Sequence, residues 1–226
     1  RYVCASRAHV IGRSAFTEEQ LVAAIDRGCR QYVLLGAGYD SSPLRLRDAL
    51  RDCTTFEVDH PATQQAKRAA VPDLSWPSNV RFVPVDFEHD SLAVQLESAG
   101  WQLDVPTFWS WLGVTMYLSD AAVMSTLAFV ASGAPGTTIV MNYTVHDDEV
   151  DPAELSLRQT GAAGVSRQGE PWINFYRPAE LARRVRALGF SSVRTVLPDE
   201  FARRYFQGRD DGLWWSSLTA AIVAQV

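Results

Sequence analysis

Apolar runs of strand length recur along the chain, and segments with a helical arrangement of apolar residues separate them. The runs are continuously apolar, which is typical of strands that are covered on both faces of a parallel sheet. A chain in which such strands alternate with helices places the helices over both faces of the sheet. The five strands predicted in this part of the chain are residues 31–35, 54–59, 79–85, 107–112 and 137–143.

Helical segments are predicted before and between these strands. The first is expected at residues 21–29, behind a capping box formed by Thr17 and Gln20. Proline near the start favours helices at residues 43–50 and 61–70, because proline is tolerated in a first helical turn. The other helices in this part of the chain are predicted at residues 91–99 and 119–132.

The alternation changes after the fifth strand. Residues 144–177 carry charges and glycines around one predicted helix at residues 153–161, and we expect them to form an insertion on the substrate side of the sheet. The remaining predicted elements are a helix at residues 178–188, a strand at 190–197, a helical segment at 199–206 and a strand at 213–226.

The whole pattern predicts one α/β domain over residues 1–226, with a helical part at residues 1–30. We expect a doubly wound, Rossmann-like, seven-stranded and mostly parallel sheet, with helices on both faces and an insertion after the fifth strand. Ligands of such sheets bind at the carboxyl ends of the strands, where the winding reverses.

The composition narrows the function classes. The chain has 226 residues, is 47% apolar and has a net charge of -5, so its surface as a whole does not attract nucleic acid or an anionic membrane. No apolar stretch reaches the length of about 18 residues that a membrane-spanning helix needs. Cys4, Cys29 and Cys53 are few and lack metal-ligand spacing, which predicts no metal site and reduced thiols in a cytoplasmic protein.

The first strand ends at two glycines, Gly36 and Gly38, with Ala37 between them. A glycine loop between a strand and a helix lets a ligand approach bare backbone. A dinucleotide fingerprint has a third glycine where Ser41 stands here, and it holds a pyrophosphate that Asp40 would repel. The loop therefore favours an adenosyl ligand without phosphates over NAD. Taken alone, it is also compatible with a purely structural turn.

Acidic residues end the next two strands. Asp59 closes the second strand, where an acid accepts hydrogen bonds from ribose hydroxyls, and Glu57 faces the same way by strand alternation. Asp86 and Phe87 close the third strand, where the carboxylate can accept the adenine amine and the ring can pack on the base. Three consecutive strand ends thus each offer a feature that suits one part of an adenosyl group.

These segments, together with one more, resemble the leucine carboxyl methyltransferase-like family. The segments are QYVLLGAGYD at residues 31–40, FEVDHP at 56–61 with Lys67 behind it, VDF at 85–87 and GVTMYLS at 113–119. The resemblance spans roughly residues 2–226 and is diffuse after Tyr143. It implies a class I methyltransferase domain that uses S-adenosyl-L-methionine, as in bacterial enzymes of polyketide and other secondary-metabolite pathways.

The resemblance also implies roles for individual residues. Arg7 would pair with the methionine carboxylate of the cofactor, which a guanidinium binds in a bidentate manner. The loop at residues 36–38 would pass close to the methionine moiety, Asp59 would hold the ribose, and residues 86–87 would frame the adenine. Leu112 occupies a position that lies near the cofactor in the family.

The chain departs from the family pattern at several of these positions. Many relatives have a glutamate where Leu112 stands, an arginine where Ser42 and Pro43 stand, and acids where Gly12 and Arg13 stand. We expect the N-terminal helical region that helps to cover the cofactor in the family to be largely absent from this chain. We expect these departures to affect cofactor affinity or the type of chemistry.

The methyl acceptor is expected at the carboxyl edge of the fourth and fifth strands. His146 is the candidate general base, and Tyr143 could assist the reaction or orient the acceptor. A carboxylate acceptor is already anionic at neutral pH and needs no base, whereas a hydroxyl needs one. Large rings near the insertion suit an apolar or aromatic small molecule, with ordinary packing as the alternative. The predicted substrate-binding residues are Tyr117, Trp172, Tyr176 and Trp214.

The leading hypothesis is an S-adenosyl-L-methionine-dependent O-methyltransferase that acts on a carboxylate or hydroxyl of a small metabolite. An NAD-dependent oxidoreductase is disfavoured by Asp40 and Ser41. A third hypothesis is a methyltransferase-like protein that binds the adenosyl cofactor but has lost or changed methyl transfer, and Leu112 keeps this hypothesis open. The expected partner is a small-molecule acceptor, with no nucleic acid or membrane, and the sequence leaves the oligomeric state open.

Overall fold

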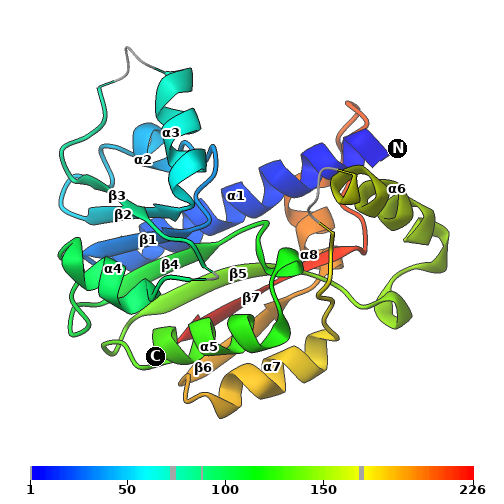
Figure 1. The fold of residues 1–226 in the computed structure, drawn as a ribbon. Helices are drawn as coiled ribbons and strands as arrows, with labels where there is room; N and C mark the ends of the chain where they lie inside the picture. Colours follow the sequence, from blue (N-terminus) through cyan, green and yellow to red (C-terminus); the bar gives the residue numbers. More distant parts are fainter. Residues whose placement is uncertain (1, 72–74, 88, 168–170) are drawn as a thin grey trace.

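A seven-stranded sheet forms the centre of the structure, a computed structural model that describes residues 2–71, 75–87, 89–167 and 171–226. The strand order is β3-β2-β1-β4-β5-β7-β6 (Figure 1). β7 is antiparallel to β5 and β6, and the other paired strands are parallel. The strands are β1 (Gln31–Leu35), β2 (Thr54–Asp59), β3 (Val80–Pro84), β4 (Thr107–Trp111), β5 (Thr138–Thr144), β6 (Ser192–Val196) and β7 (Thr219–Gln225). The predicted α/β fold class is confirmed.

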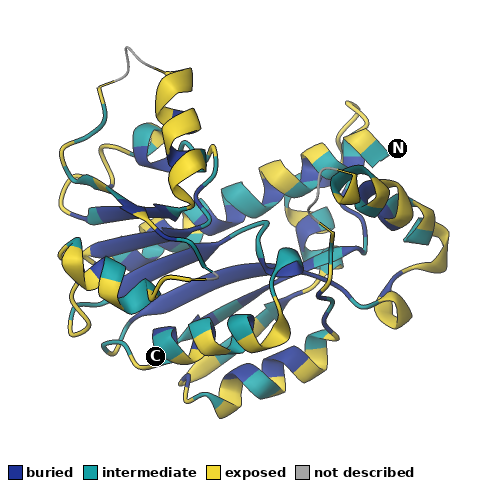
Figure 2. Cartoon of the chain, viewed as in Figure 1, coloured by how far each residue is buried: buried dark blue, intermediate teal, exposed yellow. Residues whose placement is uncertain are grey.

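Helices cover both faces of this sheet. Apolar residues of α1 and α8 pack on one face, and those of α4, α5 and α7 pack on the other. Figure 2 shows the inner strands buried along most of their length, while the edge strands β3 and β6 and the outer sides of the helices are partly exposed. In the part of the chain that is described, no helix combines the length and the apolar character needed to cross a membrane. The helices are α1 (Tyr2–Asp26), α2 (Ser42–Arg45), α3 (Pro61–Ala70), α4 (Leu92–Ser98), α5 (Asp120–Ala131), α6 (Leu155–Ser166), α7 (Pro178–Ala187) and α8 (Pro198–Phe201).

The topology places two loops side by side at one edge of the sheet. β1 and β4 are parallel neighbours, and their last residues, Leu35 and Trp111, are paired in register. The chain therefore leaves both strands at the same edge, with the glycine loop after β1 beside Leu112 and Gly113 after β4. This is the point where the order of the strands reverses, and ligands of doubly wound sheets bind there.

The helix predicted at residues 21–29 is part of a much longer one. α1 has 25 residues and begins at Tyr2, so Thr17 lies inside it and the predicted capping box is wrong. The Thr17 side chain is buried, and its hydroxyl has no hydrogen-bond partner among the described residues. The buried residues before Thr17 recur every three or four positions, and this periodicity indicates a helical face. They are Ala5, Ala8, Gly12 and Phe16.

Two further elements are shorter than predicted. α2 ends at Arg45, because only one regular turn follows the proline, whereas the prediction extended the helix to residue 50. β7 begins at Thr219 and not at residue 213. Trp215 lies before this strand, where its ring stacks on Phe201 of α8 with ring centroids 4.0 Å apart. The segment that was predicted as the start of the strand packs against a helix instead.

The insertion contains short helical pieces before α6. Asp147–Glu149 and Pro152–Glu154 each form a single 3-10 turn, and α6 then begins at Leu155. The helix predicted at residues 153–161 is therefore present but shifted toward the C-terminus. Gly161 of α6 approaches Tyr2 closely, since a Cβ atom added to this glycine would lie 2.9 Å from the Tyr2 hydroxyl. The insertion thus packs on the first turn of α1 (Figure 1).

Candidate functional site

The glycine loop after β1 adopts a backbone that few other residues can adopt. Gly36 has a φ of 66° and Gly38 a φ of 47°. The amides of Gly36 and Ala37 both donate to the carbonyl oxygen of Val58, at 2.9 and 3.0 Å, which ties the loop to β2. A Cβ atom on Gly36 would lie 2.3 Å from Cγ2 of Val114, whereas a Cβ on Gly38 would have no atom closer than 4.0 Å. The backbone at Gly38 therefore faces open space.

Asp59, at the end of β2, is hydrogen-bonded to the same loop. Its Oδ2 accepts the Gly38 amide at 2.5 Å, and its Oδ1 accepts the His60 amide at 2.7 Å. A carboxylate has about four lone-pair sites, so these two bonds leave acceptor capacity for a ligand. The side chain predicted to hold a ribose thus also holds the loop predicted to hold the methionine part.

The predicted adenine residues follow β3, one strand further along the edge. The Asp86 carboxylate lies 2.9 Å from Nδ1 of His89, and the Asp86 amide donates to the carboxylate of Asp90 at 2.8 Å. Phe87 packs against the hydrophobic core on the side of α4 and α5. The glycine loop, Asp59 and Asp86 therefore lie in the order of their strands along the carboxyl edge.

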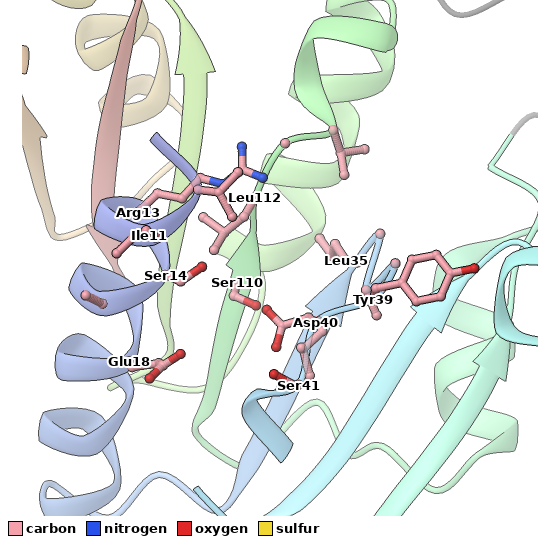
Figure 3. A pocket seen from close by; sticks show the side chains of 18 of the residues that line it. Ile11, Arg13, Ser14, Glu18, Leu35, Tyr39, Asp40, Ser41, Ser110 and Leu112 are labelled. Atoms are coloured by element: carbon pink, nitrogen blue, oxygen red, sulfur yellow. The ribbon is translucent and has the colours of Figure 1, made fainter. Parts of the chain in front are cut away.

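A cavity of about 710 Å³ opens on the α1 side of the glycine loop (Figure 3). Of the predicted cofactor residues, the glycine loop and Leu112 line it, whereas Arg7, Asp59, Asp86 and Phe87 do not. The cavity therefore covers the predicted methionine side and not the predicted adenosine side. The residues of α1 that line it are Val10, Ile11, Arg13, Ser14, Ala15 and Glu18.

Arg13 extends from α1 across this cavity to the end of β4, where Figure 3 shows it beside Leu112. A Cβ atom on Gly113 would lie 2.7 Å from Nη2 of Arg13, so the guanidinium fills the place that a side chain there would occupy. Among the described residues, none forms a hydrogen bond or an ion pair with this guanidinium. Burial lowers the pKa of Arg13, and the nearby Asp40 and Tyr117 oppose that shift.

Sequence reasoning noticed Arg13 only as a departure from the family pattern. The spacing of Ala5, Ala8, Gly12 and Phe16 is the signal that could have extended the predicted helix to include Arg13. The predicted helix began at residue 21, nineteen residues after the observed start of α1 at Tyr2, so the prediction did not place the arginine next to the loop. In the structure, Arg13 and the glycine loop line the same cavity.

Ser110, which lines the cavity, belongs to a group of buried hydroxyls. The Tyr32 hydroxyl lies 3.2 Å from both Ser42 Oγ and Ser110 Oγ. Burial raises the pKa of Tyr32, so this phenol stays protonated. Glu18 and Arg45 form a two-point ion pair, at 2.5 and 2.9 Å, at the exposed margin of the cavity. Unlike Arg13, this arginine has a counter-ion among the described residues.

Arg7 is exposed on α1, outside the cavity lining. It lies four and seven positions before Ile11 and Ser14, so all three residues share one helical face, and the latter two line the cavity. No ion pair joins Arg7 to any residue that the structure describes. Its predicted role at the methionine carboxylate stays a prediction.

The two candidate catalytic residues lie in different surroundings. Tyr143 is fully buried and packs edge-to-face on Tyr176, with ring centroids 6.0 Å apart. Burial raises its pKa, which disfavours the phenolate that a general base would need. His146 is partly exposed, and its Nδ1 accepts the Asp148 amide at 3.3 Å as the cap of the 3-10 turn. Neither residue lines the cavity beside the glycine loop.

The predicted substrate-binding aromatic residues are spread over three places. Tyr117 follows β4 and lies within electrostatic reach of Arg13. Tyr176 is buried, with its hydroxyl accepting the Asn174 amide at 2.8 Å, and Trp172 packs against Gly161 of α6. Trp214 lines a second cavity, of about 690 Å³, together with Trp215 and Phe206. The structure therefore does not gather these residues into one pocket.

The sheet order, the reversed β7 and the glycine loop after β1 together define the class I methyltransferase fold. The crystal structure titled "putative methyltransferase from Thermobifida fusca" has this fold, with a TM-score of 0.68 to the present chain. The two sequences are 18% identical, and the match covers 98% of this chain and 82% of that one. This likeness concerns the fold alone.

The sequence comparison identifies the family. The model of the leucine carboxyl methyltransferase family matches residues 3–131, more than half of the chain, so the chain belongs to this family, as predicted. A Bacillus subtilis relative, "Putative S-adenosyl-L-methionine-dependent methyltransferase YktD", is 29% identical over 208 residues, which are 90% of this chain and 67% of the relative. A Streptomyces coelicolor relative with the same description, SCO6443, is 32% identical over 80% of this chain and 60% of its own length. The chain thus spans about two thirds or less of these relatives.

Proposed function

We propose that this chain is an S-adenosyl-L-methionine-dependent O-methyltransferase that acts on a carboxylate or hydroxyl of a small metabolite, such as a secondary metabolite. The observation that carries the proposal is the positive-φ glycine loop, hydrogen-bonded to Asp59 and open to a cavity of about 710 Å³. The family membership of the chain supports the same activity.

The residues at the carboxyl edge fit this cofactor better than a dinucleotide. Asp40 and Asp59 both lie at the glycine loop, where their charges would repel a pyrophosphate but not the ammonium or sulfonium groups of the adenosyl cofactor. The open backbone at Gly38 gives the close approach that a ligand needs. In this proposal Asp59 accepts hydrogen bonds from the ribose, and Asp86 and Phe87 hold the adenine.

When bound, this cofactor supplies a methyl group on a sulfonium, which an acceptor oxygen takes in an in-line displacement. The chain's part is to align the two reactants and to keep water away from them. Among the described residues, no histidine lines the cavity beside the loop, and Tyr143 lies in the core. A carboxylate acceptor, which needs no general base, therefore suits the described part of the site better than a hydroxyl does.

Leu112 supports the second candidate function, binding of the cofactor without methyl transfer. Its apolar side chain lines the cavity at the end of β4, where it adds no charge that could orient the sulfonium or the amino group. His146 and Tyr143 do not line this cavity either. The two functions share the binding step and differ only in turnover.

Calorimetry with S-adenosyl-L-methionine, its demethylated product S-adenosyl-L-homocysteine and NAD tests the shared binding step. We expect heat of binding with both adenosyl ligands and none with NAD. A mass-gain screen against carboxylic acids and phenols then tests turnover, with a gain of one methyl group as the positive result. Absence of binding to either adenosyl ligand would contradict both functions, while binding without any mass gain would favour the second.

A further inference from the structure

Two of the chain's three cysteines lie together in the core, and the proposed function uses neither of them. Cys29 is 3% exposed and Cys53 is 1% exposed, and both pack in the hydrophobic cluster that also contains buried residues of α1. The third cysteine, Cys4, lies near the start of α1, and all three are free thiols. Cys29 and Cys53 are therefore available for chemistry that needs two sulfur atoms.

The pairing of β1 with β2 sets the distance between these two cysteines. Gln31 and Thr54 begin the paired segment, and the Thr54 amide donates to the Arg30 carbonyl oxygen at 2.9 Å, which extends the ladder by one residue. Cys29 and Cys53 directly precede the two residues that share this bond, so they lie on neighbouring chains with an offset of one residue. Neighbouring strands lie about 4.8 Å apart, and each residue adds about 3.3 Å along a strand. These spacings place the two Cα atoms within the range of about 4.4–6.8 Å that a disulfide spans.

The two thiol groups also interact directly. A hydrogen bond joins the two side chains, and together with the charge of Arg30 it lowers the pKa of Cys29, although burial opposes that shift. The same hydrogen bond, together with burial, raises the pKa of Cys53. Cys29 is therefore the thiol that loses its proton more readily, and the thiolate is the reactive form of a cysteine. A second thiol beside a reactive one is the arrangement of redox-sensing cysteine pairs.

Each of the two cysteines adjoins exposed residues of the chain. Arg30 follows Cys29 and Asp52 precedes Cys53, and both of these neighbours are exposed. Gly28, on the other side of Cys29, faces open space, since an added Cβ atom would have no atom within 4 Å. The sulfur atoms therefore lie close to the surface, where a local opening of the chain brings them within reach of an oxidant as small as hydrogen peroxide.

We propose that Cys29 and Cys53 are a redox-active dithiol that hydrogen peroxide closes to an intramolecular disulfide. The Cys29 thiolate attacks one peroxide oxygen, the O–O bond breaks, and the hydroxide that leaves takes up the thiol proton and becomes water. The Cys53 sulfur then attacks the sulfur of the resulting sulfenic acid, which forms the S–S bond and releases a second water. The two thiols are oxidised and the peroxide is reduced, and a thiol reductant reverses the change by exchange.

The proposed disulfide joins the amino ends of β1 and β2. The opposite ends of these strands carry the glycine loop and Asp59, and the segment between the cysteines contains β1, the glycine loop and α2. Closing a segment of this length into a ring restricts the unfolded chain, so we expect the oxidised protein to be more stable to heat. The inference is independent of the proposed function, because none of its steps uses the adenosyl cofactor.

Mass spectrometry of the intact protein under denaturing, non-reducing conditions tests the inference. After exposure to hydrogen peroxide we expect a mass loss of two hydrogens, a peptide pair linked through Cys29 and Cys53, and the original mass again after dithiothreitol. N-Ethylmaleimide, added after unfolding, should label only Cys4 in the oxidised protein and all three cysteines in the reduced one. The melting temperature should rise by about 5–10 °C on oxidation and return on reduction.

Three single variants separate the roles of the cysteines. Cys4→Ala should still lose two hydrogens on exposure to peroxide. Cys53→Ala leaves Cys29 without its partner, so we expect a sulfenic acid at Cys29 that dimedone traps, and no rise in the melting temperature. Cys29→Ala should leave Cys53 unoxidised.

The decisive result comes from the unmodified protein and does not depend on the folding of any variant. If N-ethylmaleimide still labels Cys29 and Cys53 after exposure to peroxide, the inference is overturned. A disulfide that contains Cys4 would overturn it as well.

Discussion

A buried lysine and a partly buried arginine lie near the carboxyl edge of the sheet, and they differ in how their charge is met. Lys67, on α3, is 5% exposed, and its Nζ lies 2.7 Å from Oε2 of Glu57 on β2. Arg13, on α1, has no such partner in the described chain. Lys67 forms its ion pair within the fold. Arg13 lines the cavity, where a ligand could supply its partner.

The environment of Glu57 supports this distinction. Burial raises the pKa of Glu57, and the adjacent Lys67, at 2.7 Å, opposes that shift. Arg13 instead keeps its charge at a cost to the free protein, because only the more distant Asp40 and Tyr117 favour it. Lys67, which has an ion-pair partner in the fold, therefore serves a structural role. Arg13, which has none among the described residues, lies on the binding side of the sheet.

Removing Lys67 is expected to have the largest effect on stability. Lys67→Met leaves Glu57 buried without a cation, which should lower the free energy of unfolding by about 3–5 kcal/mol in urea titrations. The matched double variant, Lys67→Met with Glu57→Leu, removes both charges and should recover most of that loss. Equal losses in the single and double variants would show that the pair itself contributes little beyond packing.

The pH dependence of stability probes His9, which lies beside Arg13 on α1. Burial, and secondarily the charge of Arg13, lower the pKa of His9 to about 4, while its Nε2 accepts the Ser216 amide at 3.3 Å. Because the folded pKa lies below the ordinary value of about 6.5, the unfolded chain takes up a proton first as the pH falls. This contribution is complete above pH 6.5 and disappears on acidification toward pH 4, a loss of ~3 kcal/mol.

Urea unfolding between pH 7 and pH 4 measures this slope. His9→Gln, whose amide oxygen can still accept the Ser216 amide, should show a flatter profile over this range. Arg13→Met should also flatten it slightly, because it removes the charge that opposes protonation of His9. A profile for His9→Gln that matches the unmodified protein would contradict the buried neutral histidine.

Asp59 provides a smaller effect, on binding. Asp59→Ala should weaken the binding of S-adenosyl-L-homocysteine by about 1–3 kcal/mol, because charged hydrogen bonds to the ribose are lost. Calorimetry measures this change. Asp59→Asn keeps an acceptor for the Gly38 amide, which separates the ribose contact from the support of the loop. An unchanged affinity for both variants would refute the ribose assignment.

The smallest expected effect is a gain in stability. Arg13→Met removes a desolvated charge that has no partner and should raise the free energy of unfolding by about 1 kcal/mol, or the melting temperature by about 2–4 °C. The sign is opposite to that for Lys67→Met, which makes the pair of substitutions a direct test of the comparison. A clear loss of stability would mean that Arg13 has a structural role.

The sequence predicted the regular parts of the fold closely. Thr54–Asp59 and Pro61–Ala70 have the predicted bounds, because β-branched and aromatic residues mark the strand and Pro61 marks the start of the helix. The start of α1 was misplaced because its exposed side also carries apolar residues, Val3, Val10 and Ile11, which weaken the amphipathic signal. Trp215 was assigned to a strand because its contact with Phe201 is a tertiary one that local pattern cannot reveal.

The residues of the candidate site also divide into those that the sequence predicted and those that it did not. Gly36, Gly38 and Asp59 were predictable, since strand ends and backbone freedom are local properties, and the structure brings all three together. Arg13 could not be assigned, because its importance lies in the absence of a partner, which depends on every element around it. The acceptor side was predicted least well, since rings such as Trp172 and Trp214 serve packing and binding alike.

Helix α1 lies between the two cavities, and Gly12 is the point where its backbone packs directly against the rings of the second one. A Cβ atom on Gly12 would lie 2.7 Å from Cζ3 of Trp215 and 3.0 Å from Cε2 of Phe206, and both rings line the cavity that also contains Trp214. The next residue, Arg13, lines the cavity beside the glycine loop. Because the two rings pack directly against the backbone at Gly12, they set the position of α1 and with it the position of the α1 residues that line that cavity.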